Sequence, residues 1–205
     1  MRNLLLQTVV LCSLLATCCA YNGSFMSPDV ISQLHSANVV VIGDGTTCSG
    51  VLVGQSKVLT AAHCVEMCAA LAVNVATSNG RSVGRVGRCD PDVDLALLDV
   101  DTKTTYQRWI APGPARPGDP VYIVGNPILA MPMADFTTFG IVGIVSPTQF
   151  IIGAMVKGGS SGGGVYDLKG RLVGIVSGVP LGRDGAQIDG LTVAVSQEPI
   201  AKILE

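Results

Sequence analysis

Aromatic side chains and charges are both scarce in this sequence of 205 residues. Aromatic residues make up 4% of it and charged residues 14%, with a formal net charge of −2. The few lysines and arginines are scattered, so nothing favours binding to nucleic acid or to an anionic membrane surface. Because 48% of the residues are hydrophobic, the low charge does not indicate a disordered chain. Valine and isoleucine are abundant instead, which favours β-strands.

Metal-ligand patterns are lacking as well. The sequence has two histidines, and no C-x-x-C pair or His/Cys cluster has the spacing of a zinc site. We therefore expect neither a metal nor a cofactor. His35 lies in the polar stretch SQLHSAN and is expected to be solvated. A lone histidine is usually structural, so a chemical role for His63, in LTAAHCV, depends on its neighbours.

The first twenty residues have the pattern of an export signal. Arg2 is followed by the apolar run LLLQTVVLCSLLATCCA, which ends in small residues before the polar stretch YNGSFMSPDV. We expect residues 1–20 to be a signal peptide cleaved after Ala20, which makes the mature protein secreted or periplasmic. Two alternatives stay open: a retained leader that anchors the chain in a membrane, and lipid attachment at Cys18 in LATC.

Three of the seven cysteines lie in this leader, and the mature chain would keep the other four. Those four are Cys48, Cys64, Cys68 and Cys89. An exported protein can form disulfides, and four cysteines allow three connectivities, among which the sequence does not choose.

Short runs rich in valine and isoleucine, separated by glycine, proline and asparagine, fill the chain from about residue 36. This pattern predicts an all-β barrel or sandwich. The proline-rich stretch RWIAPGPARPGDP divides the strands into two groups. We predict a first β-unit at about 36–108, a linker at 109–116 and a second β-unit at about 117–196. Residues 197–205 predict a helix that is capped by Ser196, with Ile200 and Ile203 on one face.

A serine becomes a good nucleophile only when a base takes its proton, and a third group must orient that base. His63 is the candidate base. Of the aspartates that follow it, Asp94 alone heads an apolar run, DLALLDV, where a strand would carry it toward the interior. A buried carboxylate needs hydrogen-bond partners, and an imidazole is a suitable one. We predict that Asp94 orients His63; the alternative is that Asp94 caps a loop.

The stretch KGGSSGGGV has the composition of a flexible linker, but it also contains the pattern G-x-S-G-G of a nucleophilic serine. Such a serine lies on a sharp turn whose backbone N–H groups converge on the developing oxyanion, and glycine permits both features. The pattern selects Ser161 rather than Ser160 as the nucleophile. Gly159 and Ser161 would supply the two N–H donors.

The motifs TAAHC, DLALL and GGSSGGGV, in this order, resemble those of the chymotrypsin-fold (trypsin-like) serine proteases. The stretches GDPVYIVGNP, FGIVGIVSP, LKGRLVGIVSG and GLTVAVSQEPIAKIL are similar to the compact high-temperature-requirement (HtrA-type) branch. The resemblance implies two six-stranded antiparallel β-barrels in one protease domain at 21–205, and a serine endopeptidase that acts on polypeptides. It implies that His63 is the general base, Asp94 its orienting group and Ser161 the nucleophile.

Other assignments follow from the same resemblance. Ser177, in GIVSG, matches a serine that contacts the buried aspartate. Cys48 and Cys64 occupy the positions of a disulfide that brackets the histidine loop. Cys68 and Cys89 would form the remaining pair, with two free thiols as the alternative.

The resemblance also bears on the P1 residue, which precedes the bond that is cut. Met155 stands six positions before Ser161, where relatives that cleave after Arg or Lys carry an acid. A pocket without a buried carboxylate does not pair with a cationic side chain, and Val179 would shorten it. We expect a small or medium aliphatic P1 residue.

Several features depart from the family's pattern. Ser160 stands where Asp or Asn is usual, and Gly164 replaces a proline, which is expected to loosen the loop. No IVGG-like site precedes the first strand and no PDZ domain follows before Glu205, so we expect neither activation through a new N-terminus nor a PDZ-regulated assembly or chaperone role. The departures at Ser160 and Gly164 leave a second hypothesis, a catalytically impaired binding protein on the same fold.

Overall fold

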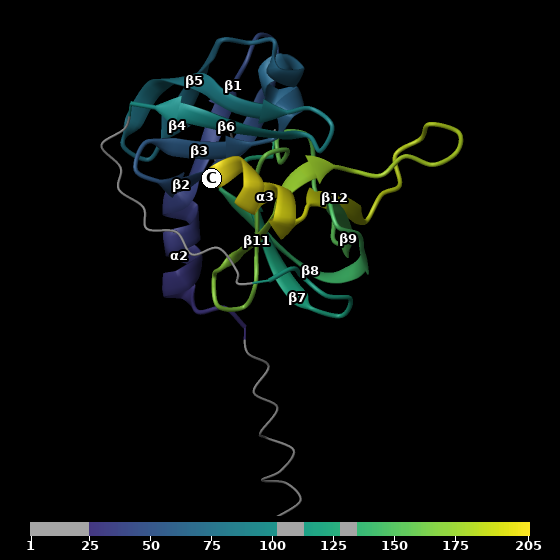
Figure 1. Ribbon diagram of the computed structural model, residues 1–205. Helices are drawn as coiled ribbons and strands as arrows, with labels where there is room; N and C mark the ends of the chain where they lie inside the picture. The colour runs from purple at the N-terminus through teal and green to yellow at the C-terminus, as the bar shows by residue number, and fades with distance from the viewer. Residues whose placement is uncertain (1–24, 102–112, 128–134) are drawn as a thin grey trace, which may run out of the picture.

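Two closed β-barrels make up the computed structural model, which describes residues 25–101, 113–127 and 135–205 (Figure 1). The strand order is β1-β2-β3-β6-β5-β4 in the first barrel and β10-β11-β12-β9-β8-β7 in the second. Neighbouring strands are antiparallel throughout. The predicted all-β fold of two six-stranded barrels with a C-terminal helix is confirmed. The signal peptide predicted at 1–20 and residues 109–112 of the predicted linker lie outside the described residues.

The strands of the first barrel are β1 Asn38–Ile42, β2 Thr47–Gly54, β3 Lys57–Thr60, β4 Ala72–Thr77, β5 Gly80–Asp90 and β6 Leu95–Val100. Those of the second are β7 Pro120–Gly125, β8 Phe136–Val145, β9 Gln149–Gly153, β10 Gly164–Tyr166, β11 Leu172–Gly178 and β12 Leu191–Val195. The helical segments are α2 Pro28–Ala37, the 3₁₀ helix η1 Ala62–Cys68 and α3 Gln197–Leu204.

Both faces of β3 and β6 are buried, each against a different core. Val58 and Leu98 belong to the core of the first barrel, whereas their neighbours Leu59 and Leu97 belong to a core between the barrels. Because successive side chains of a strand point to opposite faces, such strands have nearly continuous apolar sequences. The second barrel and α3 contribute further side chains to this core between the barrels. They include Tyr122, Val124, Ile175, Ile200 and Ile203.

Helix α2 was not expected from the sequence, although its start carries clear signals. The hydroxyl of Ser27 accepts a hydrogen bond from the N–H of Val30, and Pro28 occupies the first turn. Leu34 on its inner face is buried. The ring of His35 is half-buried and its Nε2 lies 2.7 Å from the hydroxyl oxygen of Thr137 in β8. The expectation of a solvated His35 is therefore wrong, because the helix carries this ring against the second barrel.

Helix α3 lies at the predicted place, with Ile200 and Ile203 buried. Ser196 occupies the N-cap position, but its hydroxyl donates to the carbonyl of Pro147 rather than to the first turn of the helix. Ser196 thus ties the start of α3 to the connection between β8 and β9. Within the described part of the chain, no helix is long and apolar enough to cross a membrane.

Candidate active site

Strand pairing brings His63 and Asp94 together. In the antiparallel pair of β3 and β6, Thr60 at the end of β3 lies opposite Ala96 near the start of β6. His63 follows β3 in the short helix η1, and Asp94 immediately precedes β6. The two side chains therefore emerge from the same end of the barrel, although 31 positions separate them in the chain.

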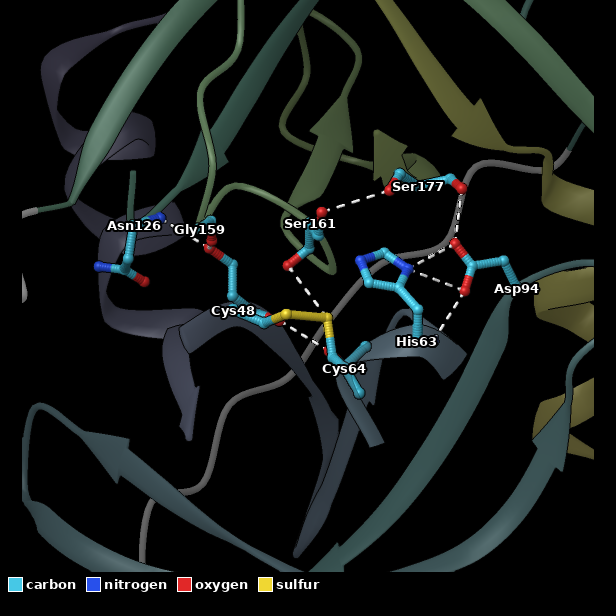
Figure 2. Close-up of a disulfide and its surroundings, with 10 residues drawn as sticks. Cys48, His63, Cys64, Asp94, Asn126, Gly159, Ser161 and Ser177 are labelled. Atoms are coloured by element: carbon cyan, nitrogen blue, oxygen red, sulfur yellow. Dashed lines mark hydrogen bonds and ion pairs between the residues drawn. A yellow bond between two sulfur atoms is a disulfide. The ribbon is translucent and has the colours of Figure 1, made fainter. Parts of the chain in front are cut away.

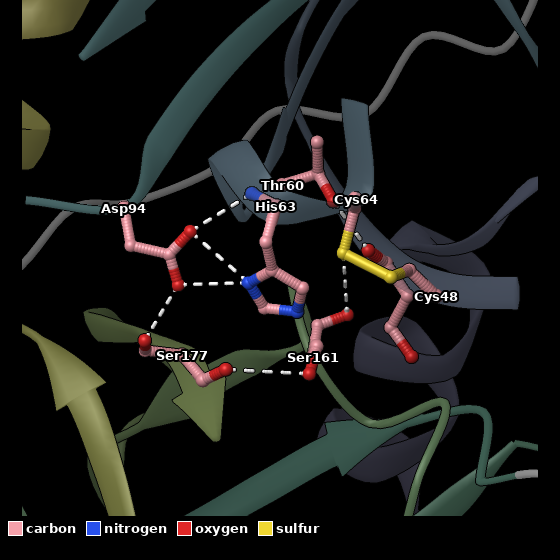
Figure 3. Close-up of polar contacts among 8 residues, drawn as sticks. Cys48, Thr60, His63, Cys64, Asp94, Ser161 and Ser177 are labelled. Atoms are coloured by element: carbon pink, nitrogen blue, oxygen red, sulfur yellow. Dashed lines mark hydrogen bonds and ion pairs between the residues drawn. A yellow bond between two sulfur atoms is a disulfide. The ribbon is translucent and has the colours of Figure 1, made fainter. Parts of the chain in front are cut away.

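Asp94 accepts hydrogen bonds on both carboxylate oxygens (Figure 3). Nδ1 of His63 lies 3.0 Å from Oδ1 and 2.9 Å from Oδ2, and the backbone N–H of His63 donates to Oδ1 at 2.9 Å. The hydroxyl of Ser177, in β11 of the other barrel, donates to Oδ2 at 2.6 Å. Because an ionised carboxylate only accepts hydrogen bonds, Nδ1 carries the proton, and Nε2 of the neutral ring is left as a proton acceptor.

The environment of Asp94 keeps it charged. Burial by itself raises the pKa of this carboxyl group, but the hydrogen bonds from His63 and Ser177 outweigh burial, so the pKa lies below its ordinary value. Its side chain is 17% exposed. The backbone at Asp94 has a φ of 59°, a left-handed conformation that aspartate tolerates better than most residues. Such conformations concentrate at functional sites.

Ser161 approaches His63 from the second barrel, in the loop between β9 and β10. Figure 3 shows the second ring nitrogen of His63 on the side of the ring that faces Ser161. The hydroxyl of Ser161 donates to the backbone carbonyl of Ser177 at 3.3 Å. Among the described residues this is its one hydrogen bond, so its proton is not shared with His63 here. Ser160 is buried and lines a cavity that Ser161 does not line.

Among residues 159–163, the N–H groups of Gly159 and Ser161 differ from the others in having no hydrogen-bond partner within the described part of the chain. The N–H groups of Ser160, Gly162 and Gly163 donate to backbone carbonyls at 2.7–3.0 Å, whereas those of Gly159 and Ser161 make no such bond. Gly159 is the third residue of the turn 157–160 and has a φ of 95°. This φ is typical of a type II turn, whose central peptide is turned over relative to a type I turn. The predicted oxyanion donors, Gly159 and Ser161, thus both have an N–H group that is not used by the backbone.

Glycine is required at two positions of this loop. A Cβ atom on Gly162 would lie 2.1 Å from the carbonyl oxygen of Ser49 and 2.3 Å from the hydroxyl oxygen of Thr60. A Cβ atom on Gly164 would lie 2.3 Å from the hydroxyl oxygen of Tyr166. Gly164 also pairs with β11 on one side and β7 on the other. The expectation that Gly164 loosens the loop is therefore wrong, since this residue lies inside a strand.

Both cysteine pairs that the resemblance implied are disulfides in the structure. Cys48 at the start of β2 is bonded to Cys64, which follows His63, with 6.0 Å between their Cα atoms (Figure 2). Cys68 is bonded to Cys89, with 5.7 Å between their Cα atoms. The sulfur of Cys64 lies 3.8 Å from the carbonyl oxygen of Ser161; it has no proton to donate, so this is a packing contact. Cys48, His63 and Cys64 are close together, but the two sulfur atoms are joined in a disulfide, which leaves no thiolate to bind a metal.

A cavity of about 150 Å³ adjoins Ser161. Its lining includes Val156, Val176, Val179, Gln187 and Asp189. The last two come from the connection between β11 and β12, which projects from the second barrel in Figure 1. Sequence reasoning missed them, because no motif marks that connection.

Met155 is not brought to this cavity. It is 54% exposed and lines a second, apolar cavity of about 220 Å³ together with Phe136 and Ser160. Of the two predicted specificity residues, Val179 thus lies beside Ser161 and Met155 does not. The neighbouring residue Val156 lines both cavities.

Comparisons with known proteins identify the family of this chain. A family model described as "Trypsin-like peptidase domain" matches residues 48–175. The chain is 28% identical over 146 residues to the chloroplastic Protease Do-like 2 of Arabidopsis thaliana, covering 63% of this chain and 23% of that protein. It therefore spans about a quarter of the length of that relative.

Solved structures show the same fold. The active form of the Rv3671c protease from M. tuberculosis superposes with a TM-score of 0.72 at 21% identity, covering 88% of this chain and 86% of that one. The serine endoprotease from Yersinia pestis superposes with a TM-score of 0.72 at 24% identity, covering 85% of this chain and 64% of that one. Because the family model covers more than half of the sequence, the chain belongs to the trypsin-like peptidase family.

Proposed function

We propose that this protein is a serine endopeptidase that hydrolyses polypeptides through Ser161, His63 and Asp94. The observation that carries the proposal is the hydrogen bonding of Asp94, which fixes the proton of His63 on Nδ1 and leaves Nε2 facing Ser161. The N–H groups of Gly159 and Ser161, which make no backbone hydrogen bond, support it. The partners are polypeptide substrates; neither nucleic acid nor a metal enters the reaction.

The reaction would run in two stages. The Oγ atom of Ser161 attacks the substrate carbonyl while Nε2 of His63 takes its proton, and the N–H groups of Gly159 and Ser161 bind the resulting oxyanion. Collapse expels the amine, which takes the proton from His63, and leaves an acyl-enzyme. Water then attacks the acyl group, gives its proton to His63 and releases the acid, and His63 returns the proton to Ser161. Asp94 stays ionised and stabilises the imidazolium in both stages.

The P1 side chain would enter the cavity beside Ser161. Its walls include Val156, Val176 and Val179, which favour a small or medium aliphatic residue. Of the two residues from which the sequence predicted this preference, Val179 lines the cavity, but Met155 lies at the other one. Asp189 on the same lining favours a competing specificity for a cationic P1 residue. A peptide library cleaved by wild type and by Asp189→Asn separates the two, since only cleavage after Lys or Arg would depend on the carboxylate.

Covalent labelling tests the nucleophile. A fluorophosphonate should label wild type and Ser160→Ala but not Ser161→Ala. Labelling that survives in Ser161→Ala and is lost in Ser160→Ala would show that Ser160, and not Ser161, is the nucleophile.

A catalytically impaired binding protein is the second candidate. The observation that favours it is the bond from the Ser161 hydroxyl to the carbonyl of Ser177 instead of to His63. Hydrogen bonds between catalytic groups often tighten only when substrate binds, so we rank this candidate second. A folded wild type that neither labels nor cleaves unfolded casein would reverse that order.

Export is a separate part of the proposal. We propose that residues 1–20 are a signal peptide cleaved after Ala20, giving a secreted or periplasmic enzyme. The alternatives are a retained leader and a lipid on Cys18. The mass of the mature protein distinguishes these outcomes, because each one leaves a different N-terminus.

A further inference from the structure

The buried hydroxyl of Ser49, in β2 of the first barrel, makes two hydrogen bonds next to the nucleophile loop. Ser49 is 0% exposed. Its Oγ donates to the carbonyl of Gly159 at 2.7 Å and accepts the N–H of Asn126, just after β7, at 2.7 Å. In Figure 2, Gly159 and Asn126 lie side by side near the Cys48–Cys64 disulfide. A single hydroxyl thus joins the first barrel to two segments of the second.

The backbone of Ser49 binds the same loop. Its N–H donates to the carbonyl of Ser161 at 2.7 Å, and its carbonyl accepts the hydroxyl of Thr60 at 2.8 Å. Ser49 therefore binds the carbonyls of Gly159 and Ser161, the two residues whose N–H groups are the proposed oxyanion donors. The peptide between Gly159 and Ser160 is bound at both ends, since its N–H donates to the carbonyl of Lys157 at 3.0 Å.

The position of Ser49 links this loop to the proposed base. Its neighbour Cys48 is bonded to Cys64, and Cys64 follows His63. The proposed nucleophile and base lie on different barrels, so their separation depends on how the two barrels are held together here. Gly125, at the end of β7, permits the close approach: a Cβ atom there would lie 3.1 Å from Oγ of Ser49 and 3.3 Å from Cα of Ser160.

We propose that Ser49 is a positioning residue: its hydroxyl keeps the oxyanion donors, the N–H groups of Gly159 and Ser161, in a fixed position relative to His63. This inference rests on the proposed serine peptidase activity. Ser49 does not touch the substrate; it acts through the backbone of residues 159–161. Glycine at position 159 allows the turn to adopt more than one peptide orientation. The hydrogen bond from Ser49 to the carbonyl of Gly159 restricts this choice, and a loop with a less flexible residue would not require it.

The test is Ser49→Ala, which removes only the hydroxyl. Deleting an oxyanion donor outright costs about 10²- to 10³-fold in kcat; here both donors remain but lose their anchor, so we expect a loss of about 10- to 100-fold. KM should stay unchanged, because the cavity beside Ser161 is untouched. A peptide boronate, whose tetrahedral adduct places an oxygen between the two donors, should lose affinity by the same factor.

Ser196→Ala is the matched control. Ser196, at the start of α3, is also buried, and its hydroxyl also donates to a backbone carbonyl, that of Pro147 between β8 and β9. It should lose stability as Ser49→Ala does, but keep its kcat and its boronate affinity. If Ser49→Ala does not fold, Ser49→Cys carries the test, because a thiol is a much weaker hydrogen-bond donor than a hydroxyl. The same changes in kcat and boronate affinity are then expected, but smaller.

Hydrogen exchange separates this inference from the proposed activity. In a Ser161→Ala background, the amides of residues 158–163 should exchange faster with Ser49→Ala than with Ser196→Ala. A wild type that folds but does not label with a fluorophosphonate would overturn the proposed activity, while faster exchange would still support the positioning role. Unchanged kcat, boronate affinity and exchange in Ser49→Ala would overturn that role, as would a loss expressed only in KM.

Discussion

The hydroxyl of Ser177 donates to Oδ2 of Asp94 at 2.6 Å, across the boundary between the two barrels. Asp94 belongs to the first barrel and Ser177 to β11 of the second. The backbone carbonyl of Ser177 also accepts the hydroxyl of Ser161. Ser177 thus contacts both Asp94 and Ser161. The hydrogen bond from its hydroxyl is one reason why the pKa of Asp94 lies below its ordinary value.

Replacing Ser177 by alanine should lower kcat and leave KM unchanged. The variant removes one donor from the carboxylate, so the pKa of Asp94 should rise toward its ordinary value. A hydrogen bond to a charged group contributes about 1.5 kcal/mol or more, so a loss of roughly tenfold in kcat is expected. Steady-state kinetics on a peptide substrate provide the measurement. A rise in KM with an unchanged kcat would contradict this role.

Asp94→Asn should change how stability depends on pH. The pKa of Asp94 is lowered in the folded protein, so its charged form stabilises the fold. That contribution is complete above the pKa of an unfolded aspartate, about 3.9, and is lost as the pH falls through the lower folded value. The difference in unfolding free energy between wild type and variant should therefore shrink below about pH 4. Urea unfolding at pH 7, 4 and 3 measures it, with the exposed Asp92→Asn as the control; a difference that is constant with pH would disprove the assignment.

Gly162→Ala should be severely destabilising. The added methyl carbon would lie 2.1 Å from the carbonyl oxygen of Ser49, and a φ of 82° at this position is unfavourable for alanine. Thermal unfolding is the measurement. The control is Gly158→Ala, where a Cβ atom meets nothing within 4 Å. Equal melting temperatures for the two variants would contradict the close packing of Ser49 against this loop.

Removing the Cys68–Cys89 disulfide should lower stability by about 2–5 kcal/mol, as is typical of native disulfides in small exported domains. The bond ties η1, which carries His63, to β5. The double variant Cys68→Ser/Cys89→Ser avoids a free thiol, and denaturant unfolding measures the change. No loss of stability would mean that these cysteines do not form the bond in the folded protein.

The strands of the barrels could be predicted from the sequence, because the burial of a strand and the turns that end it show in neighbouring residues. Val58 and Leu59, or Leu97 and Leu98, show in the sequence that both faces of a strand are buried, and the glycines and prolines between the runs mark the turns. The motifs around His63, Asp94 and Ser161 could be found in the same way, because a nucleophile loop and a base each impose a short pattern on the residues next to them. Helix α2 had equally local signals in Ser27 and Pro28, but they were overlooked.

The strand pattern and the three short motifs thus follow from residues that are close together in the sequence. Which residues meet across the two barrels depends on tertiary packing. The packing of one barrel against the other brings Ser177 to Asp94 and Ser49 to Gly159. Within the second barrel, the connection between β11 and β12 brings Asp189 to the cavity beside Ser161, whereas Met155 lines another cavity. Apart from the contact of Ser177, which its motif indicated, no short sequence pattern records these contacts, because they join segments that are far apart in the chain. The core between the barrels sets the register of the contacts that cross from one barrel to the other.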